Sequence, residues 1–158
     1  MAKRFTYKGR YIPENPKKYK GDISNIIFRS LWERRFMKYC DTNSSIIAWS
    51  SEELSIPYMS PIDNRLHRYY PDFIIKVKGK DGINTKVIEV KPKRETKPPR
   101  KTKNKVRYMY ETKTWGINSA KWAAAKLYCK NKNWEFKILT EDHIDTRNTV
   151  SYTHLRAH

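Results

Sequence analysis

Two carboxylates and a lysine occupy neighbouring β-prone segments in the middle of the chain. Asp72 lies within segment 68–77, while Glu89 lies near the end of segment 85–90 and Lys91 follows it directly. Carboxylate oxygens are the ligands that Mg²⁺ prefers, and Mn²⁺ is a substitute with the same preference. A lysine beside such a cation can orient an attacking water or stabilise charge that grows on a phosphate. This set of side chains predicts hydrolysis of phosphodiester bonds.

A short glycine-bearing segment between the two β-prone runs predicts that they form a hairpin. Residues 79–82 are Gly-Lys-Asp-Gly, and glycines suit such a loop. If the turn centres between its lysine and its aspartate, Asp72 lies opposite Glu89 and Tyr70 lies opposite Lys91. Opposed side chains have Cβ atoms about 4.5–5.5 Å apart, and like charges there destabilise a sheet. A cation bound between the two carboxylates would remove that conflict.

The side-chain alternation of the hairpin agrees with this arrangement, although a simpler interpretation exists. Successive side chains of a strand point to opposite faces, so the apolar side chains share the face away from the carboxylates: Phe73, Ile75, Val77, Ile88 and Val90. In the simpler interpretation Asp72 ends a turn, and Glu89 and Lys91 are solvated on an exposed face. That outcome is the more common one for an isolated match to this pattern. A bulge or a shifted turn would also separate the carboxylates.

The composition favours nucleic acid as the partner. The 158 residues include 34 Lys and Arg against 16 Asp and Glu, a formal net charge of +18 at pH 7. Such an excess causes self-repulsion unless a polyanion neutralises it, and we expect that polyanion to be DNA. An RNA-binding module has less support, because no glycine motif typical of RNP or KH modules appears. We expect no membrane partner and no small-molecule cofactor, since no segment approaches the roughly 18 apolar residues of a membrane span.

The chain shows no pattern of a secreted or zinc-binding protein. Its N-terminus lacks the apolar run of a secretory signal, and Cys40 and Cys129 are far apart without a CxxC spacing. These features predict a reducing compartment. The four histidines are isolated, so we expect oxygen ligands for any metal.

The remaining elements are predicted to form an α/β fold around the hairpin. Apolar side chains recur at intervals of three and four over 24–39, which predicts an amphipathic helix with Glu33 beside its buried face. Further strands are predicted at 46–49, 54–58 and 136–139, and a second helix at 119–130 with Asn118 as its N-cap. The fold class is therefore α/β, with a mixed central sheet of roughly four strands flanked by helices.

Two basic segments are predicted outside these elements. Residues 1–22 contain two prolines and several tyrosines, which predicts an extended basic arm. The segment from 93 to 107 is predicted to be a basic surface loop, and runs of this kind are usually solvated and disordered. Next to Lys91, its cations are candidates for contacts to DNA phosphates: Lys93, Arg94, Lys97, Arg100, Lys101, Lys103, Lys105 and Arg107. Five tyrosines could stack on exposed bases or pack as hydrophobes: Tyr7, Tyr11, Tyr19, Tyr108 and Tyr110.

The residues around the carboxylates carry a resemblance to a known superfamily. The run Tyr69-Tyr70-Pro71-Asp72-Phe73, followed by Val87-Ile88-Glu89-Val90-Lys91 and preceded by a helix with a glutamate, resembles the PD-(D/E)XK nucleases. The resemblance implies a core of helix, mixed sheet and second helix. It also implies Mg²⁺ held by Asp72 and Glu89, assistance to the water by Lys91, and a helix glutamate, Glu33, near the metal.

A closer resemblance covers most of the chain. Residues 13–22, 29–33, 47–52, 91–99 and 134–142 are similar, in this order, to the family of head completion nucleases of myovirus-type tailed phages. This resemblance implies a DNA endonuclease that acts after DNA packaging and before tail joining, in the host cytoplasm or in the virion. It implies capsid or portal and neck proteins as partners. The alternative is a non-catalytic structural virion protein that binds packaged DNA at the portal.

The domain organisation follows from these assignments. We predict a basic arm over 1–22, a nuclease domain over 23–146 and a tail over 147–158 that is either foreign to the protein or disordered. The tail has no helical or strand periodicity and departs from the phage family, so it is excluded from the site.

Overall fold

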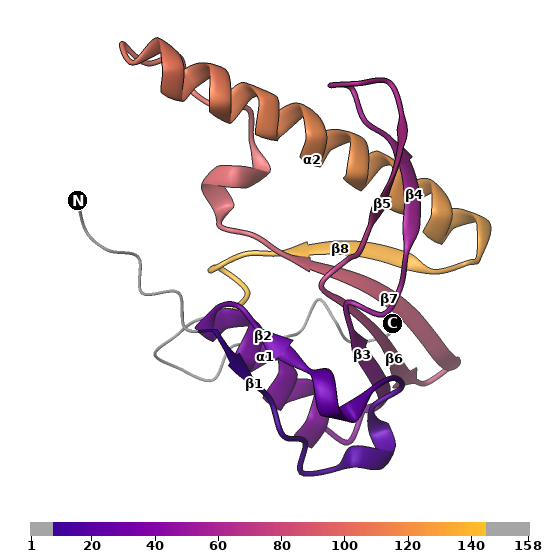
Figure 1. Ribbon diagram of the computed structural model, residues 1–158. Helices are drawn as coiled ribbons and strands as arrows, with labels where there is room; N and C mark the ends of the chain where they lie inside the picture. The colour runs from indigo at the N-terminus through magenta and orange to yellow at the C-terminus, as the bar shows by residue number, and fades with distance from the viewer. Residues whose placement is uncertain (1–7, 145–158) are drawn as a thin grey trace.

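The computed structural model describes residues 8–144, and a mixed four-stranded sheet lies at its centre (Figure 1). The strand order is β3-β6-β7-β8, with β3 at Ile46–Ser51, β6 at Phe73–Gly79, β7 at Gly82–Val90 and β8 at Glu135–Leu139. Strand β6 is antiparallel to both β3 and β7, and β8 is parallel to β7. The predicted α/β class with a mixed sheet of four strands is confirmed.

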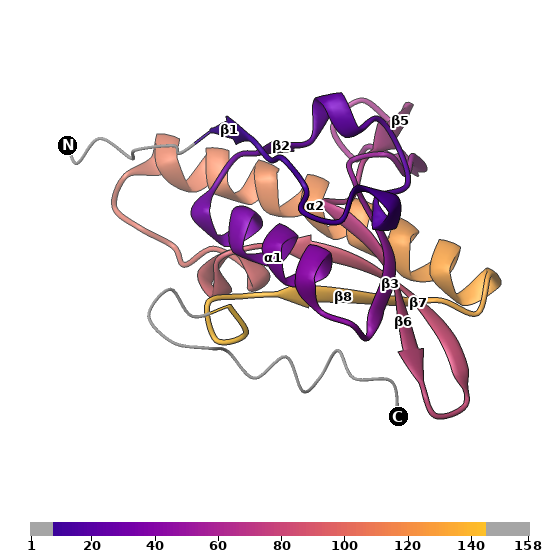
Figure 2. The same cartoon turned by 90° about the horizontal axis from the view of Figure 1, so that it is seen from below.

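The two helices cover opposite faces of this sheet (Figure 2). Helix α1 (Leu31–Thr42) packs Phe36 and Met37 against the apolar face of the β6–β7 hairpin. Helix α2 (Lys105–Asn131) packs Trp122 and Ala125 against the other face, which also carries side chains of β8. The five apolar hairpin residues predicted to share one face are all buried, because α1 covers them.

Helix α1 begins later than the predicted residue 24. Residues Ile23–Asn25 form a 3-10 turn (η2), and Ile27–Phe28 form a short strand, β2. Ser30 is the N-cap, since its Oγ accepts the N–H of Glu33 at 3.1 Å. A cap of this kind satisfies an amide that the helix leaves unpaired. The helix therefore starts where a cap is available rather than where the apolar periodicity begins.

The described part of the N-terminal segment packs onto the domain, so the predicted extended arm is wrong for residues 8–22. Strand β1 (Gly9–Arg10) pairs antiparallel with β2, and Pro16–Lys18 form a 3-10 turn, η1. Tyr11 and Tyr19 are 8% and 4% exposed and belong to the core cluster under α1. These two tyrosines are therefore not available to stack on bases. Residues 1–7, with Tyr7, lie outside the described part of the chain.

A separate two-stranded sheet interrupts the predicted strand 68–77. Strands β4 (Ile56–Met59) and β5 (Leu66–Tyr69) pair antiparallel, and the chain leaves strand conformation between β5 and β6. The interruption arises because β5 pairs with β4 and buries Tyr69 in the cluster around α2, whereas β6 pairs with β3 and β7. One predicted strand is thus two, and Asp72 lies at their junction.

Helix α2 spans 27 residues and replaces the end of the predicted basic loop. Asn104 is its N-cap and accepts the N–H of Arg107 at 3.1 Å, whereas Asn118 lies inside the helix. A 3-10 turn, η3 (Lys93–Thr96), lies in the connection that precedes α2. The predicted cap at Asn118 is wrong because a helix that is packed at one end extends readily, each added residue gaining a backbone hydrogen bond.

Three sequence expectations concern other parts of the chain. Within residues 8–144 no helix combines the length and apolar character needed to cross a membrane. Cys40 and Cys129 are buried free thiols. The predicted tail, 147–158, lies outside the described residues.

Candidate active site

The hairpin brings Asp72 and Glu89 together in the predicted register. The β6–β7 ladder keeps one register from the turn to its last pair, Phe73 opposite Ile88. The next step of that register places Asp72 opposite Glu89. Asp72 Oδ2 accepts the N–H of Val90 at 2.7 Å, so this carboxylate reaches across to the neighbouring strand.

Lys91 lies beside the pair, but Tyr70 does not lie opposite it. The Nζ atom of Lys91 is 3.7 Å from Glu89 Oε1. Its backbone N–H donates to Leu139 O at 2.9 Å, which holds the end of β7 against β8. The predicted pairing of Tyr70 with Lys91 is wrong, because the ladder ends at Phe73 and Tyr70, 47% exposed, follows β5 into the turn.

Tyr69 belongs to the site, although the sequence reasoning assigned it no role. Its hydroxyl donates to Glu89 Oε2 at 2.5 Å, and the residue is 4% exposed. From α2, Lys121 Nζ lies 5.6 Å from the centre of the Tyr69 ring, a cation–π distance. Glu89 is thus held by a hydroxyl at one oxygen and faces Lys91 at the other. Only the break between β5 and β6 directs Tyr69 toward Glu89.

Burial and mutual repulsion disfavour charge on the carboxylate pair. The pKa of Asp72 is raised well above its usual value, first by burial and then by the charges of Glu89 and Glu33. A backbone hydrogen bond and the charge of Lys91 oppose this rise. Burial also raises the pKa of Glu89, despite the hydroxyl of Tyr69 and the ammonium of Lys91 nearby. A pair that carries both charges at neutral pH therefore needs a cation close by.

Glu33 lies in the first turn of α1, where it caps the helix. Its Oε2 accepts the N–H of Arg29 at 3.0 Å, while the Oγ of Ser30 accepts the N–H of Glu33 itself, a pattern close to a capping box. Burial raises its pKa, and its charge in turn raises the pKa of Asp72. Among residues 8–144, no group of three Asp, Glu, His or Cys side chains is arranged to hold a metal ion. A role for Glu33 near the metal stays a prediction.

An ion pair that the sequence reasoning missed borders the site. Arg29 donates from Nε and Nη2 to the two oxygens of Glu52, at 3.1 Å each. Glu52 has a φ of 53°, and its N–H donates to the carbonyl oxygen of Asp72 at 3.1 Å. The pair is therefore fixed beside the start of β6. No local pattern predicts it, because the partners are 23 residues apart in sequence.

The donor set at the junction fits a magnesium ion. Mg²⁺ keeps several of its waters and is usually held by one or two carboxylates together with substrate phosphates. Asp72 and Glu89 provide two such carboxylates, both turned toward the end of one hairpin. A divalent cation would neutralise the negative charge of the two carboxylates that Lys91 only partly offsets.

The predicted DNA-binding cations occupy three kinds of structure. Lys93 and Arg94 lie in η3, Lys105 and Arg107 lie in the first turn of α2, and the connection between them carries the other four: Lys97, Arg100, Lys101 and Lys103. All eight residues are exposed. Two of them form ion pairs at 2.8 Å, Lys93 with Asp142 and Arg107 with Glu111. Contact of these eight cations with DNA stays a prediction.

The fold, a mixed four-stranded sheet between two helices, is the one expected for a nuclease domain of the PD-(D/E)XK type. Residues 43–141 match the family described as "TnsA-like endonuclease N terminal". The chain belongs to this family. The matched range contains Asp72, Glu89 and Lys91, whereas Glu33 precedes it.

The chain is also similar to a phage protein. It is 42% identical over 141 residues to the "Head completion nuclease" of Enterobacteria phage T4, and the match covers 86% of this chain and 92% of that protein. No solved structure shows a significant match. The resemblances to PD-(D/E)XK nucleases and to head completion nucleases are confirmed.

Proposed function

We propose that this chain is a Mg²⁺-dependent DNA endonuclease that acts in phage head completion, after DNA is packaged and before tails join. The proposal depends on one observation: buried Glu89 and partly buried Asp72 lie close together, with Lys91 3.7 Å from Glu89. The family of the domain and the name of the T4 relative support it. Capsid, portal or neck proteins are the proposed partners, and the host cytoplasm or the virion is the proposed place of action.

Each side chain has a separate role in phosphodiester hydrolysis. The Val90 N–H orients Asp72 and the Tyr69 hydroxyl orients Glu89, so both carboxylates are positioned to hold Mg²⁺. The ion, when bound, supplies a Lewis acid for the phosphate and lowers the pKa of water. Lys91 orients the attacking water or stabilises the negative charge that grows on the phosphate.

The exposed cations that follow Lys91 supply DNA affinity in this proposal. Phosphate contacts position a protein on DNA without identifying bases, so we expect weak sequence preference. If six to ten cations contact phosphates, affinity should fall by about 10³–10⁵ between 50 and 200 mM salt.

The test is cleavage of supercoiled and linear DNA by the purified chain, with Mg²⁺ and with EDTA. We expect cleavage only with Mg²⁺, its loss in Asp72→Ala, and DNA binding that persists in this variant. Asp81→Ala, which removes an exposed carboxylate at the β6–β7 turn, should cleave as the wild type does. DNA binding by the wild type without any Mg²⁺-dependent cleavage would support the structural virion protein instead.

A second assay tests the proposed stage of action. In an infection that depends on this chain, Asp72→Ala should leave heads filled with DNA and without tails. Empty heads in that infection would contradict the stage, although they would leave the cleavage activity in place.

A further inference from the structure

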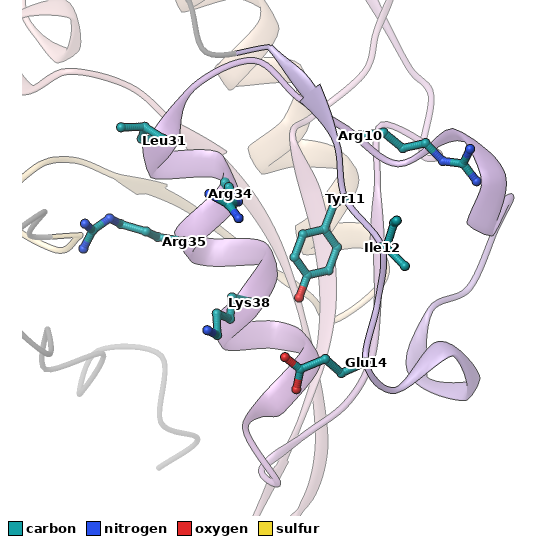
Figure 3. Close-up of a pocket in the computed structure, with 8 residues that line it drawn as sticks. All are labelled: Arg10, Tyr11, Ile12, Glu14, Leu31, Arg34, Arg35 and Lys38. Carbon is teal, nitrogen blue, oxygen red and sulfur yellow. The ribbon is translucent and has the colours of Figure 1, made fainter.

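A cavity of about 610 Å³ lies between α1 and residues 10–14 of the N-terminal segment, apart from the carboxylate pair (Figure 3). We call it the basic groove. Four of its lining residues are cationic, and one is acidic: Arg10, Arg34, Arg35 and Lys38 against Glu14. All five are exposed. The groove therefore presents a clear excess of positive charge to solvent.

The helical spacing places three of these cations on one side of α1. Arg34, Arg35 and Lys38 differ in position by one, three and four residues, so they share one side of α1. The opposite side carries Phe36 and Met37 into the core. Arg10, in β1, also lines the groove, 24 residues before Arg34 in sequence, and its guanidinium points away from α1 (Figure 3). Packing of the N-terminal segment on α1 is what assembles the groove.

The wall formed by the N-terminal segment is held in place by the buried carboxylate of Asp41, at the C-terminal end of α1. Asp41 accepts the hydroxyl of Tyr11 at 2.8 Å and the N–H groups of Glu14 and Asn15 at 2.7 and 2.9 Å. Tyr11 also donates its N–H to Ile26 O at 2.8 Å. Both carboxylate oxygens of Asp41 thus accept hydrogen bonds at the base of the wall, and the groove does not have to form when a ligand arrives.

We propose that the basic groove binds the phosphate backbone of the DNA substrate outside the cleavage site. Arg34 directly follows Glu33 in α1, and the groove extends along this helix. Arg34 and Lys38 are about 6 Å apart along the helix axis, so both can contact phosphates of the same DNA strand. The inference rests on the proposed function, which makes DNA the substrate.

The test compares two pairs of helical cations with the same spacing. Arg34→Gln with Lys38→Gln removes two cations of the groove. As the control, Lys126→Gln with Lys130→Gln removes two exposed cations, also four residues apart, near the C-terminal end of α2. Binding of a fluorescein-labelled duplex is followed by anisotropy between 50 and 200 mM NaCl, in an Asp72→Asn background that prevents cleavage.

The slope of log affinity against log salt is negative, and loss of two phosphate contacts should make it shallower by about 1.8. The loss of affinity between 50 and 200 mM salt should therefore be about tenfold smaller in the groove variant than in the control variant. Arg34→Lys with Lys38→Arg keeps both charges and should restore the parental slope, which separates lost charge from damaged folding. A groove variant with the affinity and slope of the control would overturn the inference. The same result is expected if the groove binds an acidic protein instead of DNA.

Cleavage assays of the wild type separate this inference from the proposed function. If the wild type cleaves DNA and the groove variant keeps the parental slope, the groove inference fails and the nuclease stands. If the wild type does not cleave but the groove variant loses slope, DNA binding in the groove is supported and the nuclease function fails.

Discussion

Replacing Asp72 by asparagine should abolish cleavage and also stabilise the metal-free protein. Asparagine keeps an acceptor for the Val90 N–H, which Asp72 Oδ2 accepts at 2.7 Å, but it removes one of two opposed charges. Like charges about 5 Å apart repel by about 3 kcal/mol at an effective dielectric constant of about 20. Lys91 offsets part of this repulsion, so the free energy of unfolding should rise by about 1–3 kcal/mol. For a domain of this size, the Tm should rise by about 2–10 °C.

Thermal and urea unfolding in EDTA measure this effect, with Asp81→Asn as the exposed control. Burial raises the pKa of Asp72 in the folded state, so folding favours its protonated form. The metal-free wild type therefore loses stability as the pH rises above the unfolded carboxyl pKa of about 4. The gap in stability between D72N and the wild type should accordingly widen as the pH rises from 4.

Mg²⁺ should narrow that gap, because only the wild type keeps both carboxylates. At a concentration ten times its Kd, the ion should stabilise the wild type by about 1.4 kcal/mol. It should leave D72N nearly unchanged. A D72N variant less stable than the wild type in EDTA would refute the argument, as would equal stabilisation of both proteins by Mg²⁺.

Three further variants test the neighbours of the pair. Lys91→Met should slow cleavage by about 10²–10⁴-fold with little change in DNA affinity, and a rate within tenfold of wild type would remove its assigned role. Tyr69→Phe should lower the free energy of unfolding by about 1.5–3 kcal/mol, because Glu89 loses a buried donor; an unchanged urea midpoint would contradict this bond. Ser30→Ala should lower the free energy of unfolding by about 1 kcal/mol, because α1 loses its N-cap. An exposed serine, Ser44, serves as the control for that loss and should change the free energy of unfolding by less than about 0.5 kcal/mol when replaced by alanine.

The hairpin and its register could be predicted because they depend on local features. A strand has a side-chain period of two, and a shift by one residue would move every side chain of the strand to the other face. The apolar residues from Phe73 to Val90 and the glycines of the turn therefore favour the register that the structure shows. The resemblance to PD-(D/E)XK nucleases implies the same role for Lys91 that its position beside the carboxylates predicts.

Only the tertiary structure decided the surroundings of that pair. Tyr69 reaches Glu89 because β5 pairs with β4 rather than continuing into β6. The long α2 extends back to Asn104, because packing of its C-terminal half makes further helix favourable.

The cations of the basic groove come together in the same non-local way. Arg10 and Lys38 both line it only because buried Asp41 holds residues 11–15 against α1. The sequence by itself determined the opposed carboxylates, through periodicity within one hairpin. Contacts between distant segments decided which hydroxyl, ion pair and basic surface lie around them, because no short pattern encodes a pairing across 20 or more residues.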